Sequence, residues 1–196
     1  MLRDEAKIVI VVASVMMLIG SMSVFFLPFL SLFIDDEFKM AVSRAEQVDI
    51  DVVPVHDRPF GFITRAEATY WYNKTALSRD MPIYSDDICI FNDIQELSQD
   101  VLDSVILACR YRFFWWSKWW FAPDALLTKS SSLVAITKWL YPRDEFVGML
   151  PYREPFVERA YDLGITKYHS TEFLERPITK YELLLQLYRL WQIPSQ

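Results

Sequence analysis

Ile63-Thr64-Arg65-Ala66-Glu67 is the stretch that decides the fold. Its pattern of an aliphatic residue, a threonine and a basic residue returns at Leu127-Thr128-Lys129 and at Ile178-Thr179-Lys180. In each copy the threonine stands where a helix N-cap belongs, because its side-chain oxygen can accept hydrogen bonds from the first helical turn. A glutamate three residues later completes a capping box in the first and third copies, whereas Ser131 takes that place in the second. We therefore expect three helices to begin at these points.

A longer repeat surrounds this element. Four apolar residues of the middle unit are matched by apolar residues 52 positions further on: Val105, Ala108, Phe113 and Phe121 correspond to Val157, Ala160, Ile165 and Phe173. Each unit therefore contains a first helix, a loop, the threonine-basic element and a second helix. Such a unit exposes an apolar stripe, so neighbouring units are expected to stack and bury it. The first unit is the least regular, with its first helix expected at Glu37–Val48.

An uncharged stretch precedes the repeats. Ile8–Ile34 contains 27 residues without a charged side chain, which as a helix would measure about 40 Å against a hydrocarbon core of about 30 Å. We expect a transmembrane helix, with Pro28 marking either its exit from the membrane or a kink. A cleaved signal peptide is the alternative, but its apolar core is only about 7–15 residues long, with the cleavage site close behind. The nearest fair site, Ala41-Val42-Ser43, lies well past the stretch.

The charges on either side of this stretch predict its orientation. Arg3 and Lys7 precede it, whereas Asp35, Asp36 and Glu37 follow it. The positively charged flank of a membrane span usually stays in the cytoplasm. We therefore expect a single-pass protein of the cell membrane, with its N-terminus in the cytoplasm and its repeats outside.

The composition argues against several classes of function. Only four glycines occur, which disfavours a glycine-rich phosphate-binding loop, and the net charge of −6 disfavours nucleic acid as a partner. Two cysteines and two histidines are too few for an ordinary zinc site. His56 and His169 fall in expected loops, without the signature of a nucleophile and an orienting acid. We expect no enzymatic activity, no metal site and no cofactor.

The repeat pattern resembles that of the S-layer homology (SLH) domain family. The family opens a repeat with Phe-x-Asp, continues with a Phe-x-Pro-[DN] loop and opens the second helix with Ile-Thr-Arg-Ala-Glu. The first two motifs stand here as Phe91-Asn92-Asp93 and Phe121-Ala122-Pro123-Asp124, and the third as Ile63–Glu67. The resemblance covers roughly Gly61 to Trp191, with the middle copy as the most specific match.

The resemblance implies a fold and a division of the chain. The fold would be all-α, with one N-terminal transmembrane helix followed by SLH-like helix-loop-helix repeats in a pseudo-threefold bundle. The expected parts are a cytoplasmic tail, the transmembrane helix, a degenerate first repeat, a second repeat and a third repeat: residues 1–7, 8–34, 35–80, 81–142 and 143–196.

The resemblance also implies a glycan-binding role for one repeated position. In the family, the basic residue of the Thr-Arg-Ala-Glu element lies in a groove between repeats and pairs with an acidic sugar of the cell wall. The matching glycan-binding residues are the three cations and the two capping glutamates: Arg65, Lys129, Lys180, Glu67 and Glu182. A cation is mildly unfavourable in a first helical turn, so its repetition favours ligand contact. The alternative is a solvated charge whose stem packs on a neighbour.

A disulfide between Cys89 and Cys109 is also expected. Cys89 lies just before Phe91, and Cys109 lies on the apolar face of the helix that follows, so the chain can fold back within one repeat. A similar cysteine pair occurs in some members of the family that the chain resembles. The alternative is two buried free thiols, since free cysteine is among the most buried residue types.

A tryptophan-rich loop, Phe113–Phe121, reads FFWWSKWWF. Its first and last residues match apolar positions of the third unit and are expected in the core. Its tryptophans match mostly polar residues, so an exposed patch is expected that includes the lysine between them: Trp115, Trp116, Lys118, Trp119 and Trp120. Such a patch usually marks a contact surface. We expect its partner to be a protein in the first place, the membrane surface in the second and a glycan in the third.

Two functions follow from these patterns. The first is an envelope protein whose SLH-like domain binds cell-wall or S-layer polysaccharide and so links the membrane to the wall. The alternative is a structural protein-protein interaction module of an envelope complex that docks through the tryptophan-rich loop. The patterns are also compatible with a homo-oligomer.

Overall fold

A computed structural model of the chain describes residues 36–52, 60–84, 89, 91–111, 113, 120–140, 154–168 and 174–194. The contacts of the chain divide it into two compact parts, Met1–Lys39 and Met40–Gln196. The packing reported below is that of the second part. The transmembrane helix expected at residues 8–34 lies outside the described residues.

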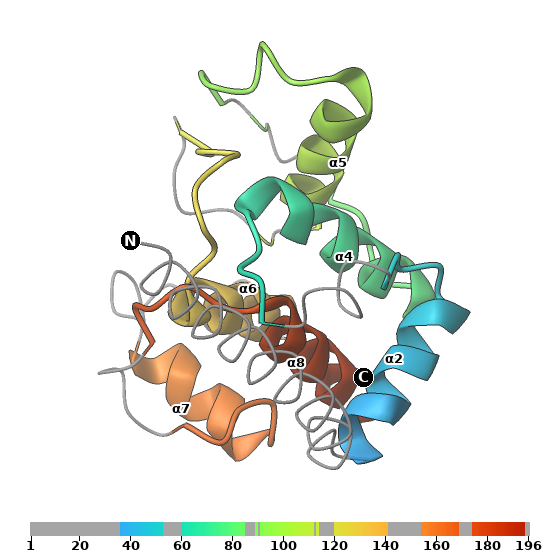
Figure 1. Ribbon diagram of the computed structural model, residues 1–196. Helices are drawn as coiled ribbons and strands as arrows, with labels where there is room; N and C mark the ends of the chain where they lie inside the picture. The colour runs from blue at the N-terminus through green and yellow to red at the C-terminus, as the bar shows by residue number, and fades with distance from the viewer. Residues whose placement is uncertain are drawn as a thin grey trace, which may run out of the picture. The chain divides into compact units, whose positions relative to one another are not determined.

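The described part of the chain is helical, as Figure 1 shows, and its secondary-structure elements are six helices without a strand. The prediction of an all-α fold is confirmed. In chain order the helices are α2 (Asp36–Gln47), α4 (Arg65–Ser78), α5 (Gln99–Arg110), α6 (Lys129–Leu140), α7 (Glu154–Asp162) and α8 (Lys180–Gln192). None of these described helices combines the length and the apolar character that a membrane span requires.

Threonine side chains fix where the second helices of the units begin. The backbone N–H of Glu67 donates to Thr64 Oγ1 over 3.2 Å, and the backbone N–H of Thr64 donates to the carboxylate of Glu67 over 2.8 Å. Thr179 and Glu182 form the same reciprocal pair at the start of α8. At the start of α6, the backbone N–H of Ser131 donates to Thr128 Oγ1 over 3.2 Å. The three helix starts predicted from the sequence are confirmed.

A Thr179→Ala variant should lower the free energy of unfolding by about 1 kcal/mol, because the first turn of α8 loses its side-chain acceptor. A Thr179→Ser variant keeps that acceptor and should retain most of the stability. Urea denaturation of the full chain in detergent, followed by circular dichroism, measures both changes. Equal losses in the two variants would show that the cap contributes nothing.

The residues before the three threonines join the units in a closed ring of backbone hydrogen bonds. Ile63 N–H donates to the carbonyl of Ile178, Ile178 N–H to that of Leu127, and Leu127 N–H to that of Ile63, over 3.3, 2.8 and 2.9 Å. The side chains of all three are at most 1% exposed. A second set of bonds, with donors two residues further on, runs around the units in the opposite direction: from the N–H groups of Arg65 and Lys129 to the carbonyls of Ala125 and Arg176, and from that of Lys180 to Gly61. The starts of α4, α6 and α8 therefore converge on one ring.

The core is enclosed where the first helix of one unit packs on the second helix of the unit before it, α5 on α4 and α7 on α6. In Figure 1, α4 lies beside α5, and α6 beside α7. A buried chain of hydrogen bonds links the three second helices, since Tyr72 donates to Ser132 over 2.9 Å and Ser132 donates to Gln186 over 2.6 Å. Phe113 and Phe121, expected in the core, are 1% and 0% exposed.

A disulfide joins Cys89 to Cys109 at the end of α5, with the two Cα atoms 6.1 Å apart. The expected pairing is confirmed, and the alternative of two free thiols is wrong. A backbone hydrogen bond from the N–H of Tyr84 to the carbonyl of Arg110, 3.1 Å long, joins the same two segments. The chain between α4 and α5 is thereby tied to the end of α5.

Candidate functional site

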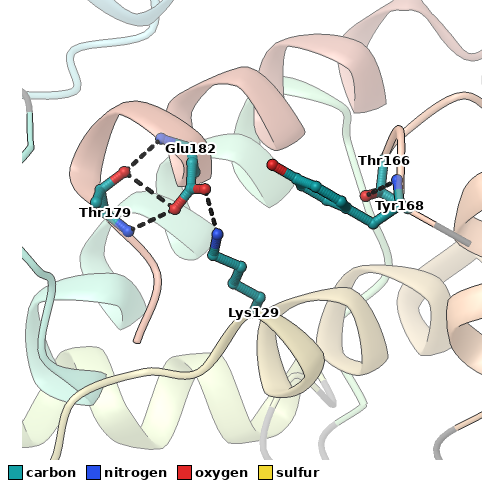
Figure 2. Close-up of polar contacts among 5 residues, drawn as sticks. All are labelled: Lys129, Thr166, Tyr168, Thr179 and Glu182. Atoms are coloured by element: carbon teal, nitrogen blue, oxygen red, sulfur yellow. Dashed lines mark hydrogen bonds and ion pairs between the residues drawn. The ribbon is translucent and has the colours of Figure 1, made fainter. Parts of the chain in front are cut away.

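The predicted glycan-binding residues Lys129 and Glu182 meet between α6 and α8, as Figure 2 shows. Lys129 is the first residue of α6, and its Nζ lies 2.5 Å from Oε1 of Glu182, in the first turn of α8. The two side chains are 16% and 25% exposed. A partly buried pair of this kind interacts more strongly than a pair in open solvent, because less water screens it.

An aromatic ring covers the lysine from a further segment. The ring centroid of Tyr168, on the loop after α7, lies 5.3 Å from Lys129 Nζ. The backbone N–H of Tyr168 donates to Thr166 Oγ1 over 3.1 Å, which fixes the loop at that residue. The ammonium group therefore has a carboxylate as one neighbour and the electron-rich face of a phenol ring as another.

These residues line a cleft of about 330 Å³ that is formed mainly by the third unit, with one residue each from the middle unit, Lys129, and the first unit, Phe60. Aromatic rings from three segments contribute to its wall, namely those of Phe60, Tyr168 and Tyr181. Its charged lining consists of three cations and one carboxylate: Lys129, Lys167, Arg189 and Glu182. A concave site with flat apolar surfaces and an excess of positive charge suits a ring-shaped polar ligand that carries a negative group.

A second ion pair links the third unit to the first. Lys180 Nζ lies 3.1 Å from Oε1 of Glu67, and the two side chains are 16% and 47% exposed. Burial alone would raise the pKa of Glu67, but hydrogen bonds from Thr64 and Lys180 outweigh it and hold that pKa below its ordinary value. This pair repeats the chemistry of Lys129 and Glu182, although neither of its members lines the cleft.

The third predicted cation, Arg65, has a different environment. Its guanidinium carbon lies 5.2 Å from the ring centroid of Phe121. Burial lowers the pKa of Arg65, and the charge of nearby Asp93 opposes that shift. Ser131 stands in the middle unit where the other two junctions have a glutamate. The three repeated cations therefore occupy matching positions in the sequence, but Lys129 and Lys180 each pair with a capping glutamate of the next unit, whereas Arg65 lies over an aromatic ring.

The sequence found the charged centre of the cleft but missed its aromatic wall. Lys129 and Glu182 were predicted as glycan contacts, whereas Phe60, Tyr168 and Tyr181 were not. One signal was present, because the 52-residue offset matches Tyr168 with Trp116, a residue of the expected aromatic patch. An aromatic residue recurs there in both units, and the structure places the later one over the lysine.

The aromatic patch stays a prediction for most of its residues. Trp120 is 62% exposed, as expected for a residue of a contact surface. Trp115, Trp116, Lys118 and Trp119 lie outside the described residues, as do both histidines of the chain. Within the described ranges, no group of three or more histidine, cysteine, aspartate or glutamate residues could hold a metal ion.

Comparison with known proteins identifies no family for the chain. No protein-family model matches the chain. No curated protein matches it either. The cleft, the ring of backbone bonds and the repeated sequence elements are the features of the chain that bear on its function.

Proposed function

We propose that the chain is a membrane-anchored envelope protein whose three SLH-like repeats form a pseudo-threefold bundle and bind acidic cell-wall polysaccharide. The uncharged stretch Ile8–Ile34 would anchor it as a single span, with the repeats outside the cytoplasm. In this role the protein links membrane and wall, and the bound sugar lies in the cleft around Lys129.

Two features support three related repeats. The closed ring of backbone bonds uses the same position of each unit, and each donor lies immediately before the capping threonine of its unit. The ion pairs follow the order of the second set of backbone bonds, because Lys129 reaches the next unit at Glu182 and Lys180 reaches the first unit at Glu67. Unrelated helices would have no reason to repeat both patterns from unit to unit.

The observation that carries glycan binding is the combination of aromatic and cationic groups in one cleft. A sugar ring presents C–H faces that pack on aromatic side chains such as Tyr168, and an acidic sugar adds a carboxylate that Lys129 can bind. The volume of about 330 Å³ is at the lower end of small-ligand sites, which suits a short piece of a polysaccharide. That Arg65 and Lys180 also contact the polysaccharide stays a prediction.

A Lys129→Met variant tests this proposal. Full-length protein in detergent should co-sediment with insoluble wall polysaccharide from the cells that make it, less strongly as salt rises. The variant should bind about tenfold more weakly, because it loses the cation and keeps a similar apolar stem. Lys74→Met is the matched control, since Lys74 also pairs with a carboxylate, that of Asp49, but lies outside the cleft lining. Unchanged binding by Lys129→Met, or equal loss in both variants, would refute a glycan site in this cleft.

A further inference from the structure

We infer that Glu182 is a competing carboxylate built into the cleft, which an anionic ligand must displace from Lys129 and which thereby lowers the affinity of the cleft for anionic saccharides and leaves that for neutral ones unchanged. This inference rests on the proposed function, and it concerns a residue whose first task in the fold is to cap α8.

The two oxygens of Glu182 have separate partners. Oε2 accepts from the backbone N–H and the hydroxyl of Thr179, both over 3.1 Å, and so completes the cap of α8. Oε1 accepts a hydrogen bond from the ammonium group of Lys129. Figure 2 shows the carboxylate between these two residues. A ligand can therefore take over the bond made by Oε1 while Oε2 keeps the cap, so displacement leaves the start of the helix intact.

The lysine keeps its place without the glutamate. Its ammonium group lies over the ring of Tyr168, and its backbone N–H donates to the carbonyl of Arg176 over 3.1 Å as part of the ring that joins the units. Neither contact involves Glu182. Loss of the internal carboxylate therefore leaves a cation in the wall of the cleft, where a ligand carboxylate gains a charge-assisted hydrogen bond.

A lower affinity for anionic ligands follows from this competition. A neutral sugar offers nothing that compensates the ammonium group, so the internal pair stays closed and the sugar meets only the aromatic wall. An anionic sugar replaces one carboxylate by another, and its gain is reduced by the internal pair that it breaks. Removal of the charge of Glu182 should therefore strengthen binding of anionic ligands alone.

A Glu182→Gln variant is the direct test, because glutamine is accepted at this position of a capping box and its amide oxygen can still accept from Thr179. The ligand is the soluble acidic polysaccharide fraction of the wall, and the matched ligand is the same fraction after its carboxyl groups have been reduced to alcohols. Full-length protein in detergent is titrated with each by calorimetry. Glu182→Gln should bind the acidic fraction about three- to tenfold more tightly than the wild type, the range expected for one partly screened ion pair, and should bind the reduced fraction unchanged.

Two further proteins identify the source of any gain. Asp49→Asn changes the net charge equally at a carboxylate that pairs with Lys74 outside the cleft lining, and asparagine tolerates the positive φ of 61° at that position. It should leave the affinity for the acidic fraction as in the wild type. In a Lys129→Met background, Glu182→Gln should give no gain.

The outcomes separate the two proposals. Wild-type binding to the acidic fraction without a gain in Glu182→Gln refutes the competing carboxylate and leaves the proposed function in place. An equal gain in Asp49→Asn, or a gain that persists with Lys129→Met, refutes it as well by assigning the effect to net charge. If neither the wild type nor any variant binds, the proposed function fails and the role of Glu182 fails with it.

Discussion

A Lys138→Met variant is expected to exceed the wild type in free energy of unfolding by about 5 kcal/mol at pH 6 and by much less at pH 10. Lys138 lies in α6 and is only 7% exposed, with its ammonium group 5.8 Å from the ring centroid of Phe156 in α7. Burial lowers the pKa of Lys138 to about 7, because the charged form loses its hydration. Methionine keeps the apolar contact with the ring and carries no charge.

The pH dependence comes from the two states of the chain. The ordinary lysine pKa is 10.5, so between about pH 7 and pH 10.5 the unfolded state holds a proton that the folded state has released. The stability of the wild type therefore rises with pH across this window. Below pH 7 both states are protonated, and the cost of burying the charge is complete. The methionine variant lacks this dependence, so its advantage is largest below pH 7 and fades toward pH 10.5.

Urea denaturation of the full chain in detergent at the two pH values measures this difference. Lys39→Met provides the control, because the Lys39 side chain is 63% exposed and its removal should change little at either pH. An equal gain for Lys138→Met at pH 6 and pH 10 would contradict a buried, titrating lysine. A loss of stability at pH 6 would show that the charge at this position stabilises the fold.

Removal of the disulfide is the other change with a large expected effect. Replacing Cys89 and Cys109 together by alanine should lower the free energy of unfolding by about 3 kcal/mol, because the bond spans a sequence separation of 20 and restricts the unfolded chain. Cys109 is 8% exposed, so alanine is preferred to serine, which would bury a hydroxyl group.

Reductant gives an independent measurement of the same bond. Dithiothreitol should lower the urea midpoint of the wild type nearly to that of the double alanine variant and should leave the variant unchanged. Thiol labelling of denatured, unreduced wild type should find no reactive thiol. Two labelled thiols, or an equal response of both proteins to reductant, would be inconsistent with the bond.

Local signals account for what could be predicted from the sequence. Thr64 and Thr179 specify helix starts through atoms within three residues of each other, so their capping boxes are readable from the sequence alone. Phe113 and Phe121 were assigned to the core because their counterparts one repeat later are apolar, and burial follows side-chain type closely. The cysteines could be paired because they lie within one repeat.

Contacts between distant segments account for what could not be predicted. Lys129 and Glu182 were each proposed as ligand contacts, but their pairing depends on the relative placement of α6 and α8, which no short pattern encodes. Tyr168 reaches the cleft through a loop whose path is set by tertiary packing. Likewise, Lys138 has no sequence feature that separates it from an exposed lysine, because its burial arises from helix packing.

The closed backbone ring affects how the protein folds while it is being synthesised on the ribosome. Ile63 and Ile178 are 115 residues apart in the chain and are direct hydrogen-bond partners, so the first unit's segment, although it can pair with Leu127 of the middle unit, stays half-paired until the last unit has been made. Contacts of such high sequence separation slow folding, because a long loop has to close before they form. During that interval the open segment can pair with the Ile178 segment of another chain, which is the route to domain-swapped dimers. Truncation before Ile178 makes this exposure permanent, so shortened chains should aggregate rather than fold as smaller bundles.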